Sequence, residues 1–475
     1  LGLTLMTCTL CCVHAGQAPG LASASDIPIS AADRVYTADQ FSNTVSVIDP
    51  SSNRLLGVIR LGDPQPANLS PLYPGQVLVH GLGFSPDHKT LAVVSILTNS
   101  VTFIDTRTNQ ILHTSYVGRA PHEAFFSPDN REVWVSVRGQ NYIQVLDGKT
   151  FEHKDRIELP NGPGMTIFSP DGTYAYVCSS FTPETDVFDV KTHRLAGKVK
   201  QPSPFCPNIA ASPDGRQVWL TLKDSGKVEV FDAKPPFGII SVMDTGPITN
   251  HVNFVKDDEG VYAYVTIGGL NQIKVFDTKN LKQITAIPVG ALPHGIWPSG
   301  DGKRIYVGLE NDDKVAVIDT QRHALITTIQ IGQAPQALVY VPQASPAGVD
   351  SSNLQPLGLA GQVAQMKLGA FGGDGRALTQ VTLFDQGLTQ VLQAAVTGLK
   401  PGSAYTLNLV DSQSGQGDVQ PLTHFKTNAS GSAIVNVFGP IRQILCPSVA
   451  EKRRYLEITD DSIAPVVGKP AQIQL

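Results

Sequence analysis

Short apolar runs and polar turns alternate over residues 293–332. Turn-forming residues cluster at 298–302, 310–313 and 319–322, and each of the four runs between and around them is long enough for one strand. This pattern predicts four antiparallel strands joined by tight turns. A single unit of this kind cannot bury both faces of its sheet, so we expect further copies in the chain.

The same pattern recurs seven times in the first two thirds of the chain. In each copy an aliphatic or aromatic residue is followed by Asp and a polar turn, at Ile48-Asp49, Ile104-Asp105, Leu146-Asp147, Phe188-Asp189, Phe231-Asp232, Phe276-Asp277 and Ile318-Asp319. Successive Asp residues are 42 to 45 residues apart, except for a first interval of 56. Periods of this length with four strands each are typical of propeller blades, so the sequence predicts a seven-bladed β-propeller.

The first repeat begins at Arg34 without the strand that opens the other repeats. Residues 333–341 carry the opening pattern after the seventh blade, with no blade behind them. We therefore expect this segment to pair with residues 34–39 and to close the ring. Closure would remove the exposed sheet edges of an open array.

Two further features repeat with the blades. Ser-Pro-Asp-Gly is a favourable turn because Pro fixes φ, Asp bonds its own backbone and Gly accepts a positive φ. Shortly after the turn a large aromatic residue recurs, as Trp134, Tyr176, Trp219, Tyr264 and Tyr306. We assign these rings to packing between blades rather than to a ligand cage.

Small residues and Pro at 343–353 separate the propeller, residues 34–342, from a second domain at 354–475. Short alternating runs between Gly, Asp and Pro turns predict an antiparallel sandwich there. Residues 398–407, GLKPGSAYTL, are similar to the fibronectin type III pattern, which implies an immunoglobulin-like domain. The expected fold is all-β, a seven-bladed β-propeller followed by a smaller C-terminal β-sandwich.

Several strings resemble the YVTN-family β-propeller repeats of bacterial exported proteins and archaeal surface-layer proteins. They are Tyr264-Val265-Thr266-Ile267, Ser42-Asn43-Thr44-Val45-Ser46-Val47-Ile48-Asp49, Phe168-Ser169-Pro170-Asp171-Gly172 and Pro293-His294-Gly295-Ile296. The resemblance covers the propeller repeats and implies the fold. Its functional implication is broad, since relatives include binding proteins, surface proteins, lactonase-like enzymes and the non-covalent haem domain of cytochrome d1 nitrite reductases.

Charge excludes one class of partner. The chain has 36 Lys and Arg against 41 Asp and Glu, a formal charge of −5, and no basic run. Neither nucleic acid nor an anionic membrane is therefore an expected partner.

The first residues are read as a leader. Leu1–Val13 is apolar, and small residues that suit signal cleavage follow, so we expect a signal peptide over residues 1–24, truncated at its N-terminus. The apolar run is too short to span a bilayer, and no other stretch is apolar enough to be transmembrane. The expected location is periplasmic or secreted.

Outside the leader the cysteines are Cys178, Cys206 and Cys446, with no CxxC or CxxCH motif, so covalent haem is excluded. The propeller would place Cys178 and Cys206 on one rim, close enough for a disulfide in an oxidising compartment. Two buried free thiols are the interpretation that the sequence favours. An insertion with four Pro, residues 63–79, separates blades 1 and 2 and is either decoration or a lid over the adjacent mouth.

One column of the repeats carries most of the candidate chemistry. Near the start of the opening strand it holds His80, His122, His251 and His294, with Asn208 and Gln336 among the remaining blades. This end of each strand lies at one mouth of the channel. The side chains would converge there with Glu123 and with loops that carry Arg138, Lys223 and Glu310.

Two interpretations of the column remain open. His80, His122, His251 and His294 are the possible ligands of a transition metal such as copper or zinc, or a general base, and Arg138 and Lys223 would be available to a small anionic ligand. Alternatively, Pro-His is a structural habit of the repeat that satisfies backbone groups between blades.

No Walker A, GxGxxG, HExxH or GxSxG motif is present, and we assign no catalytic residue. We therefore favour an exported, non-enzymatic binding or scaffold protein that presents the propeller mouth to a small-molecule ligand or a protein. The alternative is a periplasmic lactonase-like or metal- or cofactor-dependent redox enzyme that uses the His-lined channel.

Overall fold

The architecture is given by a computed structural model of the chain. It describes residues 27–62, 77–345, 352–358, 363–386, 389–414, 417–439, 453–461 and 469–475. The expected signal peptide at 1–24, most of the insertion at 63–79 and Cys446 lie outside these residues. Regular structure within them is β-strand, apart from one turn of 3-10 helix, η1 (Gly268–Leu270).

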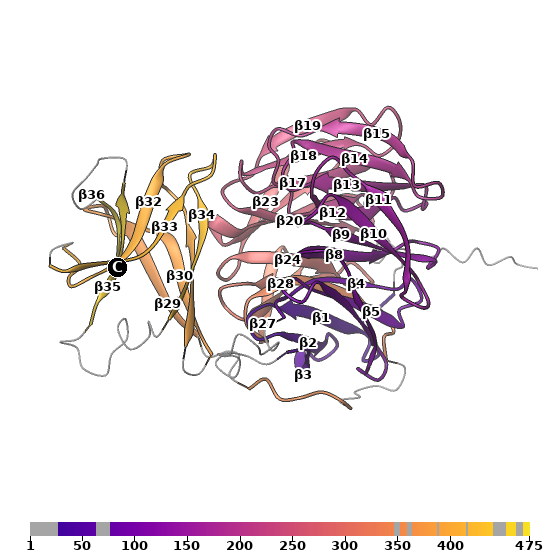
Figure 1. Cartoon of the computed structure of the whole chain (residues 1–475), viewed down its shortest axis with the longest axis horizontal. Coiled ribbons are helices and arrows are strands. Elements are labelled where there is room, and N and C mark those ends of the chain that lie inside the picture. Colours follow the sequence, from indigo (N-terminus) through magenta and orange to yellow (C-terminus); the bar gives the residue numbers. More distant parts are fainter. Residues whose placement is uncertain are drawn as a thin grey trace, which may run out of the picture.

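Seven four-stranded antiparallel sheets form the blades of a propeller (Figure 1). For blades 1 to 7 in turn, the innermost strands are β28 (Pro335–Val341), β4 (Val79–Phe84), β8 (Pro121–Phe126), β12 (Pro163–Phe168), β16 (Ile209–Ala211), β20 (Thr249–Lys256) and β24 (Pro293–Pro298). The second strands are β1 (Arg34–Asp39), β5 (Thr90–Ser95), β9 (Glu132–Val137), β13 (Tyr174–Ser179), β17 (Gln217–Leu222), β21 (Val261–Ile267) and β25 (Arg304–Leu309). The third strands are β2 (Thr44–Asp49), β6 (Ser100–Asp105), β10 (Tyr142–Asp147), β14 (Glu184–Asp189), β18 (Lys227–Asp232), β22 (Gln272–Asp277) and β26 (Lys314–Asp319). The outermost strands are β3 (Arg54–Arg60), β7 (Ile111–Tyr116), β11 (His153–Glu158), β15 (Leu195–Lys200), β19 (Ile239–Asp244), β23 (Gln283–Pro288) and β27 (Ala324–Gln330).

Burial falls from the axis to the rim. Every residue of β8, β12, β24 and β28 is buried, whereas the outermost strand β11 exposes all but one of its residues. The inner strands lie between two neighbouring blades, so both of their faces are covered and their apolar runs are nearly continuous. The hydrophobic core therefore lies between blades rather than within any single one.

Ring closure occurs as the sequence predicts. β28 pairs antiparallel with β1, and Val339 lies opposite Tyr36. The hydroxyl of Tyr340 donates a hydrogen bond to Asp33 at the start of the first blade. Blade 1 is thus assembled from the two ends of the propeller sequence.

The predicted turns and core rings are also confirmed. In the Ser-Pro-Asp turns the Ser hydroxyl donates to the Asp carboxylate, for example Ser169 Oγ to Asp171 Oδ1 at 2.6 Å. The five recurrent aromatic rings are at most 1% exposed. The polar ends of four of them bond within the core, as Trp219 Nε1 does to Gln217 Oε1 at 2.9 Å. The rings therefore pack the blades and leave no aromatic face for a ligand.

The C-terminal domain is a single sheet of eight strands. They are β29 (Val363–Ala370), β30 (Ala377–Asp385), β31 (Gln390–Val396), β32 (Ala404–Val410), β33 (Val419–Lys426), β34 (Ala433–Gly439), β35 (Tyr455–Asp460) and β36 (Lys469–Gln474). Their order in the sheet is β33-β32-β35-β36-β29-β30-β31-β34, and the edge strands β33 and β34 contact each other. The sheet thus nearly closes around its own core. The expected fold class, an all-β propeller with a smaller C-terminal β-domain, is confirmed.

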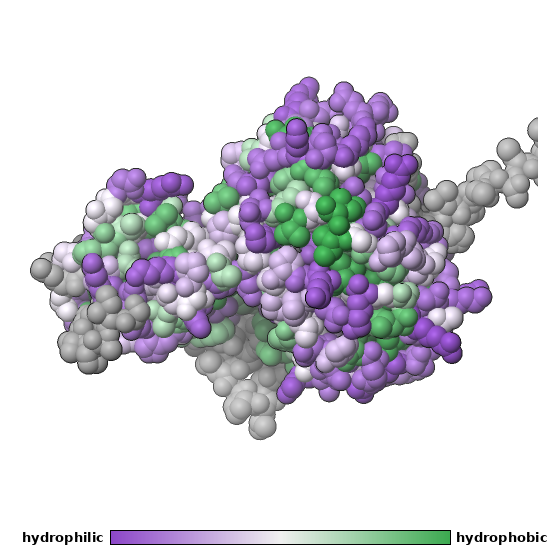
Figure 2. Space-filling model, turned by 90° about the horizontal axis from the view of Figure 1, so that it is seen from above, coloured by the Kyte–Doolittle hydropathy of each residue, from purple (hydrophilic) through white to green (hydrophobic). Residues whose placement is uncertain are grey.

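The outer rim of the propeller carries exposed apolar side chains. Figure 2 shows hydrophobic residues on the propeller as seen from above, and Figure 1 places β15 and β19 on that side. Leu195, Ile239, Ile240 and Val242 of these strands are 42–50% exposed.

Among the residues that the structure describes, no helix has both the length and the hydropathy needed to cross a membrane.

Substitution of Val339 by Asp should unfold the ring. Val339 is 1% exposed in the closing strand, and a carboxylate there would lack a partner, so we expect a loss of ~3 kcal/mol or more in the free energy of unfolding. Val242→Asp is the matched control, because Val242 is 42% exposed on β19. Urea denaturation measures both, and equal losses would show that the closing strand has no special role.

Candidate functional site

The C-terminal domain covers part of one mouth of the propeller. Phe384 packs edge-on against Phe41 of blade 1, with ring centroids 5.1 Å apart. Ala395 lies in an apolar cluster with Ile248 and Leu292, which directly precede the innermost strands of blades 6 and 7. All of these propeller residues lie at the end of the blades where the opening strands begin. The mouth that carries the His column is therefore the covered one.

Hydrogen bonds fix the two domains together around the apolar contacts. Gln386 Nε2 donates to the Phe41 carbonyl at 2.8 Å, and Thr382 Oγ1 donates to the Asn311 carbonyl at 2.9 Å. On blade 5, the Ser430 amide donates to the Asp224 carbonyl at 3.0 Å. No hydrogen bond or apolar cluster of the described residues joins residues 363–475 to blades 3 and 4. The cover is thus one-sided.

Gln393 lies on the face of β31 that packs against the propeller, opposite Thr382, which bonds Asn311 of blade 7. It is on β31 between Val391 and Ala395, and alternate residues of a strand share one face. Val391 packs with Phe41 of blade 1, and Ala395 packs at blades 6 and 7, so Gln393 faces the propeller between them. Gln393 is 3% exposed, and its Oε1 has no hydrogen-bond partner.

Bulges in the innermost strands direct the column toward the mouth. The pairing register shifts between Val79 and Leu82 in blade 2, and at the corresponding places in blades 3, 6 and 7. His80, His122, His251 and His294 fall inside these irregular stretches. A bulge bends its strand and re-aims the side chains that it contains. The four imidazoles therefore point to the axis instead of into the packing between blades.

The imidazoles form two pairs from neighbouring blades. The ring centroids of His80 and His122 are 4.6 Å apart, and those of His251 and His294 are 4.8 Å apart. Burial, together with nearby positive groups, lowers the pKa of His80 to about 3 and the pKa of His122 and His251 well below its usual value. These rings are therefore neutral at pH 7.

Glu310 accepts a hydrogen bond from His294 Nδ1 at 2.8 Å. Burial opposes ionisation of Glu310, but the bond with His294 and the charge of Lys223 hold its pKa at about 2. Burial also lowers the pKa of His294, although Glu310 opposes this shift. The arrangement is that of a neutral imidazole donating to a carboxylate, with Gln336 as a further donor to Glu310.

The pKa of Glu123 shifts in the opposite direction from that of Glu310. Burial raises the pKa of its carboxyl to about 8, while a bond from the Leu82 amide opposes the shift. Glu123 is 3% exposed, and its Oε2 has no partner. It lies against Gly81, where a Cβ would stand 2.6 Å from that oxygen, so only glycine fits there. At pH 7 Glu123 is mostly a neutral acid.

Arg138 and Lys223 are the cations of the mouth. The Arg138 guanidinium carbon lies 4.9 Å from the centroid of Phe205. Burial lowers the pKa of Lys223, with Glu310 and Asp224 opposing and Arg138 contributing. Neither cation has a hydrogen-bond acceptor or an ion-pair partner among the described residues. Both side chains are half-buried.

Asn208 acts as a structural member of the column. Its Oδ1 accepts the Val252 amide of the next blade at 2.9 Å, and its Nδ2 contacts Met165 Sδ at 3.1 Å. Asn311, which follows Glu310, was not predicted as a site residue. Its side chain is fully buried, and both polar atoms lack partners. Its place directly after a predicted loop residue was the available signal.

The geometry does not gather metal ligands. Within the described ranges no group of three or more His, Cys, Asp or Glu side chains is placed to hold a metal ion. The rings of the His residues contact each other in pairs, and Glu310 is hydrogen-bonded to His294. What the mouth offers instead is a set of unpartnered polar atoms: His80 Nδ1, His122 Nδ1, Glu123 Oε2, Gln393 Oε1 and both ends of the Asn311 amide.

The channel below the mouth is narrow. A cavity of ≈20 Å³ lies between the innermost strands, lined mainly by apolar side chains with Glu123, Asn208 and His251. That volume is enough for about one water molecule. The channel therefore closes the mouth from below.

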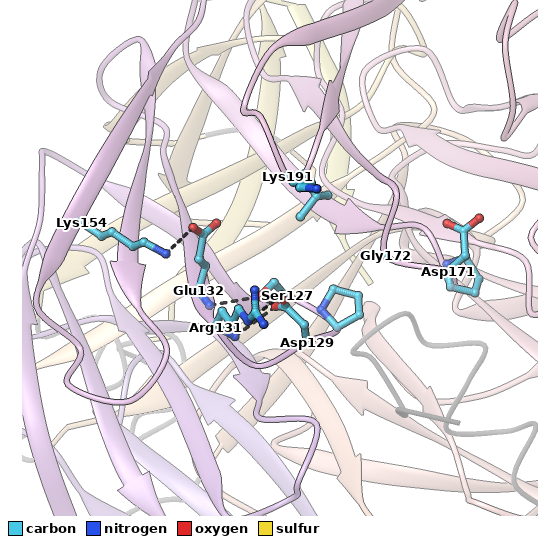
Figure 3. Close-up of a pocket in the computed structure, with 11 residues that line it drawn as sticks. Ser127, Asp129, Arg131, Glu132, Lys154, Asp171, Gly172 and Lys191 are labelled. Atoms are coloured by element: carbon cyan, nitrogen blue, oxygen red, sulfur yellow. Dashed lines mark hydrogen bonds and ion pairs between the residues drawn. The ribbon is translucent and has the colours of Figure 1, made fainter. Parts of the chain in front are cut away.

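Wider recesses lie elsewhere. One of ≈680 Å³ is on the opposite face, between the Ser-Pro-Asp turns of blades 3 and 4 (Figure 3). Most of its charges are in ion pairs, as in the 2.7 Å contact between Lys154 and Glu132. We place the candidate site at the mouth, because unpartnered buried groups point to a missing ligand while paired ones do not.

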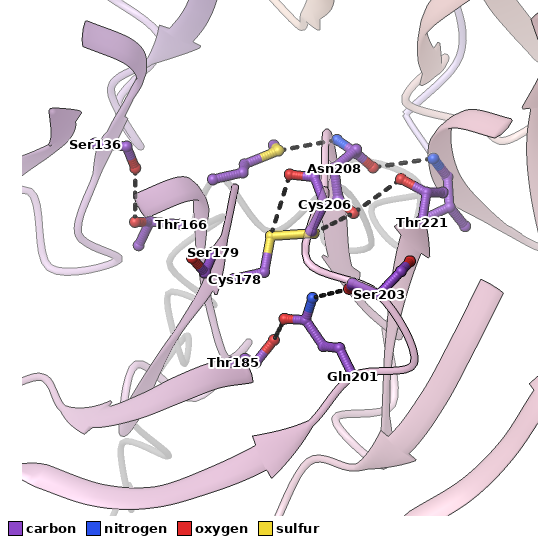
Figure 4. Close-up of a disulfide and its surroundings, with 12 residues drawn as sticks. Ser136, Thr166, Cys178, Ser179, Thr185, Gln201, Ser203, Cys206, Asn208 and Thr221 are labelled. Atoms are coloured by element: carbon purple, nitrogen blue, oxygen red, sulfur yellow. Dashed lines mark hydrogen bonds between the residues drawn. A yellow bond between two sulfur atoms is a disulfide. The ribbon is translucent and has the colours of Figure 1, made fainter. Parts of the chain in front are cut away.

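Cys178 and Cys206 form a disulfide, which corrects the favoured expectation of two free thiols (Figure 4). The sulfurs meet because β13 of blade 4 and the segment that leads into β16 of blade 5 run side by side, with Cα atoms 6.0 Å apart. The bond lies two residues before Asn208. It therefore anchors the entry of blade 5 beside the mouth.

The propeller sequence matches a known family. A model of the YNCE-like beta-propeller family matches residues 3–346. Protein NirF of Pseudomonas aeruginosa is 28% identical over 99 residues, which are 20% of this chain and 24% of NirF. The match thus spans about a quarter of that relative's length.

Two solved structures share the fold. Hydrazine synthase of Kuenenia stuttgartiensis superposes with a TM-score of 0.51 and 18% identity, covering 60% of this chain and 94% of that one. A functionally unknown protein from Desulfotomaculum acetoxidans gives a TM-score of 0.55 and 11% identity, covering 64% and 98%. At these identities the likeness is one of fold.

Replacing His80 should flatten the dependence of stability on pH. Its folded-state pKa of about 3 lies below the unfolded value, so the unfolded chain takes up the proton first as the pH falls below about 6.5. Between pH 7 and 5 the wild type should lose about 2 kcal/mol that His80→Asn does not lose. Urea denaturation across this range measures the difference. His153→Asn, at an exposed site on β11, should leave the wild-type slope, and equal slopes for all three proteins would contradict a half-buried, neutral imidazole at His80.

Loss of the disulfide should destabilise the propeller. The bond closes a loop with a sequence separation of 28, for which the loss of chain entropy in the unfolded state corresponds to ~3–4 kcal/mol. A Cys178→Ser, Cys206→Ser variant should therefore lose that much free energy of unfolding, measured by urea denaturation. Reducing agent should reproduce the loss in the wild type and do nothing further to the variant. A wild type that is indifferent to reducing agent would show that the bond does not stabilise the fold.

Proposed function

We propose that this chain, which belongs to the YNCE-like beta-propeller family, is an exported binding protein that holds a small-molecule ligand at its His-lined mouth. A propeller fold does not by itself fix a function, so the function is inferred from the site. The single observation that carries the proposal is the set of buried, unpartnered polar atoms at that mouth. Buried polar groups in native proteins find partners, so their place here is explained by a ligand.

The one-sided cover favours a small molecule over a protein partner. The C-terminal domain contacts blades 1, 5, 6 and 7, so a partner protein would meet that domain and not the imidazoles. A small molecule would enter along blades 3 and 4. The propeller would serve as the rigid scaffold of the site, and the C-terminal domain as its partial cover.

The protonation states of the imidazoles suit binding better than general-base catalysis. A general base works best when its pKa is near the working pH, whereas burial lowers the pKa of His80 to about 3. Export is supported by the disulfide between Cys178 and Cys206, because such bonds persist in oxidising compartments.

The test is retention of a ligand by purified protein. Native mass spectrometry and extraction of small molecules should find a bound compound in the wild type, with at least tenfold less in a His80→Ala, His251→Ala variant that keeps its thermal midpoint. His153→Ala on the outer strand β11 is the control and should retain the compound.

Three results would overturn the proposal: no bound compound, equal retention by the double variant, or turnover of lactones or amines at ordinary enzymatic rates. Elemental analysis of untagged protein, beside a His122→Ala, His294→Ala variant, tests the metal-dependent alternative. Stoichiometric metal in the wild type that the variant lacks would favour that alternative.

A further inference from the structure

Two cations stand at the mouth, Arg138 on its uncovered arc and Lys223 beside the docked C-terminal domain. Arg138 follows β9 in blade 3, and Lys223 follows β17 in blade 5. Each contributes to the electrostatics of the imidazoles: Arg138 acts on His80 and His122, and Lys223 on His251 and His294. Both charges therefore act on the side of the mouth that carries the four rings.

The nearby carboxylates are occupied elsewhere. Glu310 is bonded to His294 at 2.8 Å, and the Asp224 side chain bonds to Asn428 of the C-terminal domain. Among the described residues, no carboxylate oxygen lies within 4.0 Å of a side-chain nitrogen of Arg138 or Lys223. Two half-buried cations without a counter-charge in contact are a place for an anion.

Apolar side chains border the same arc. Phe205 lies under the Arg138 guanidinium at 4.9 Å. Phe181 is 56% exposed, and its ring and the Arg138 carbonyl flank the same glycine: a Cβ at Gly162 would stand 2.7 Å from the ring and 2.2 Å from that oxygen. An aromatic ring left exposed beside an unpaired guanidinium offers a surface for the apolar part of a ligand.

We propose that the ligand of the mouth is an organic anion, with an oxyanion headgroup between Arg138 and Lys223 and an apolar body against Phe181 and Phe205. This inference rests on the proposed function and specifies its ligand class. Arg138 supplies a planar fork that matches a carboxylate or phosphate, and Lys223 adds a point charge. The unpartnered amide of Asn311 and the Oε1 of Gln393 would then bond polar groups at the covered side of the ligand.

Benzoate, its neutral isostere benzamide and inorganic phosphate are the probes. Calorimetric titration of the full chain should give a dissociation constant for benzoate at least tenfold lower than for benzamide or phosphate. Raised salt should weaken benzoate binding, because the headgroup contact is electrostatic.

Variants locate the contact. Arg138→Gln and Lys223→Gln should each weaken benzoate binding tenfold or more, and Phe181→Ala should weaken it several-fold without affecting folding. Lys191→Gln is the matched control, since Lys191 lines the recess on the opposite face and should have no effect. Thermal midpoints within the error of the wild type establish that each variant is folded.

The outcomes separate this inference from the proposed function. Equal binding of benzamide and benzoate, phosphate as tight as benzoate, or indifference to both cation variants overturns the organic anion. If the wild type still retains a natural compound that the His80→Ala, His251→Ala variant loses, the proposed function stands without it. If nothing is retained and no probe binds, both fail.

Discussion

The pairing of β28 with β1 is the constraint on which the rest of the molecule depends. Each blade contacts mainly its two neighbours, so the ring has a fixed geometry only when its last strand completes its first blade. The same strand supplies Gln336, which bonds Glu310 at the mouth. The segment just before it contributes Ala334 to the apolar contact with the C-terminal domain. Closure therefore positions the mouth and its cover together.

At the mouth, polar side chains lie in a region that packing shields from water. Bulges turn the column residues out of the regular ladder and toward the axis, where neighbouring strands and the C-terminal domain exclude water. Under these conditions an imidazole is more stable neutral than charged, and a carboxyl stays neutral unless, like Glu310, it has a donor. The result is a polar surface with little charge of its own, beside two unpaired cations. Such a surface favours recognition of a ligand by hydrogen bonding and by charge at one side.

The C-terminal domain decides what can reach that surface. By resting on blades 1, 5, 6 and 7 it buries Gln393 against blade 7 and leaves the arc near Arg138 open. A propeller without this domain would expose the whole mouth to solvent and to proteins. The cover displaces water from part of the mouth, and each electrostatic contact is stronger there.

The sequence by itself determined what repeats. The period of the Asp turns set seven blades, the orphan strand at 333–341 set ring closure, and the alignment of the repeats brought the His column and its loops together, because each of these depends on local pattern or on fixed spacing. Only the tertiary structure decided the pairing of the imidazoles, the disulfide between Cys178 and Cys206, and the roles of Asn311 and Gln393. These features depend on how blades and domains meet across long separations in the chain. No local signal encodes that docking, because the identity of an Asn or Gln residue does not show whether another part of the chain will bury its amide.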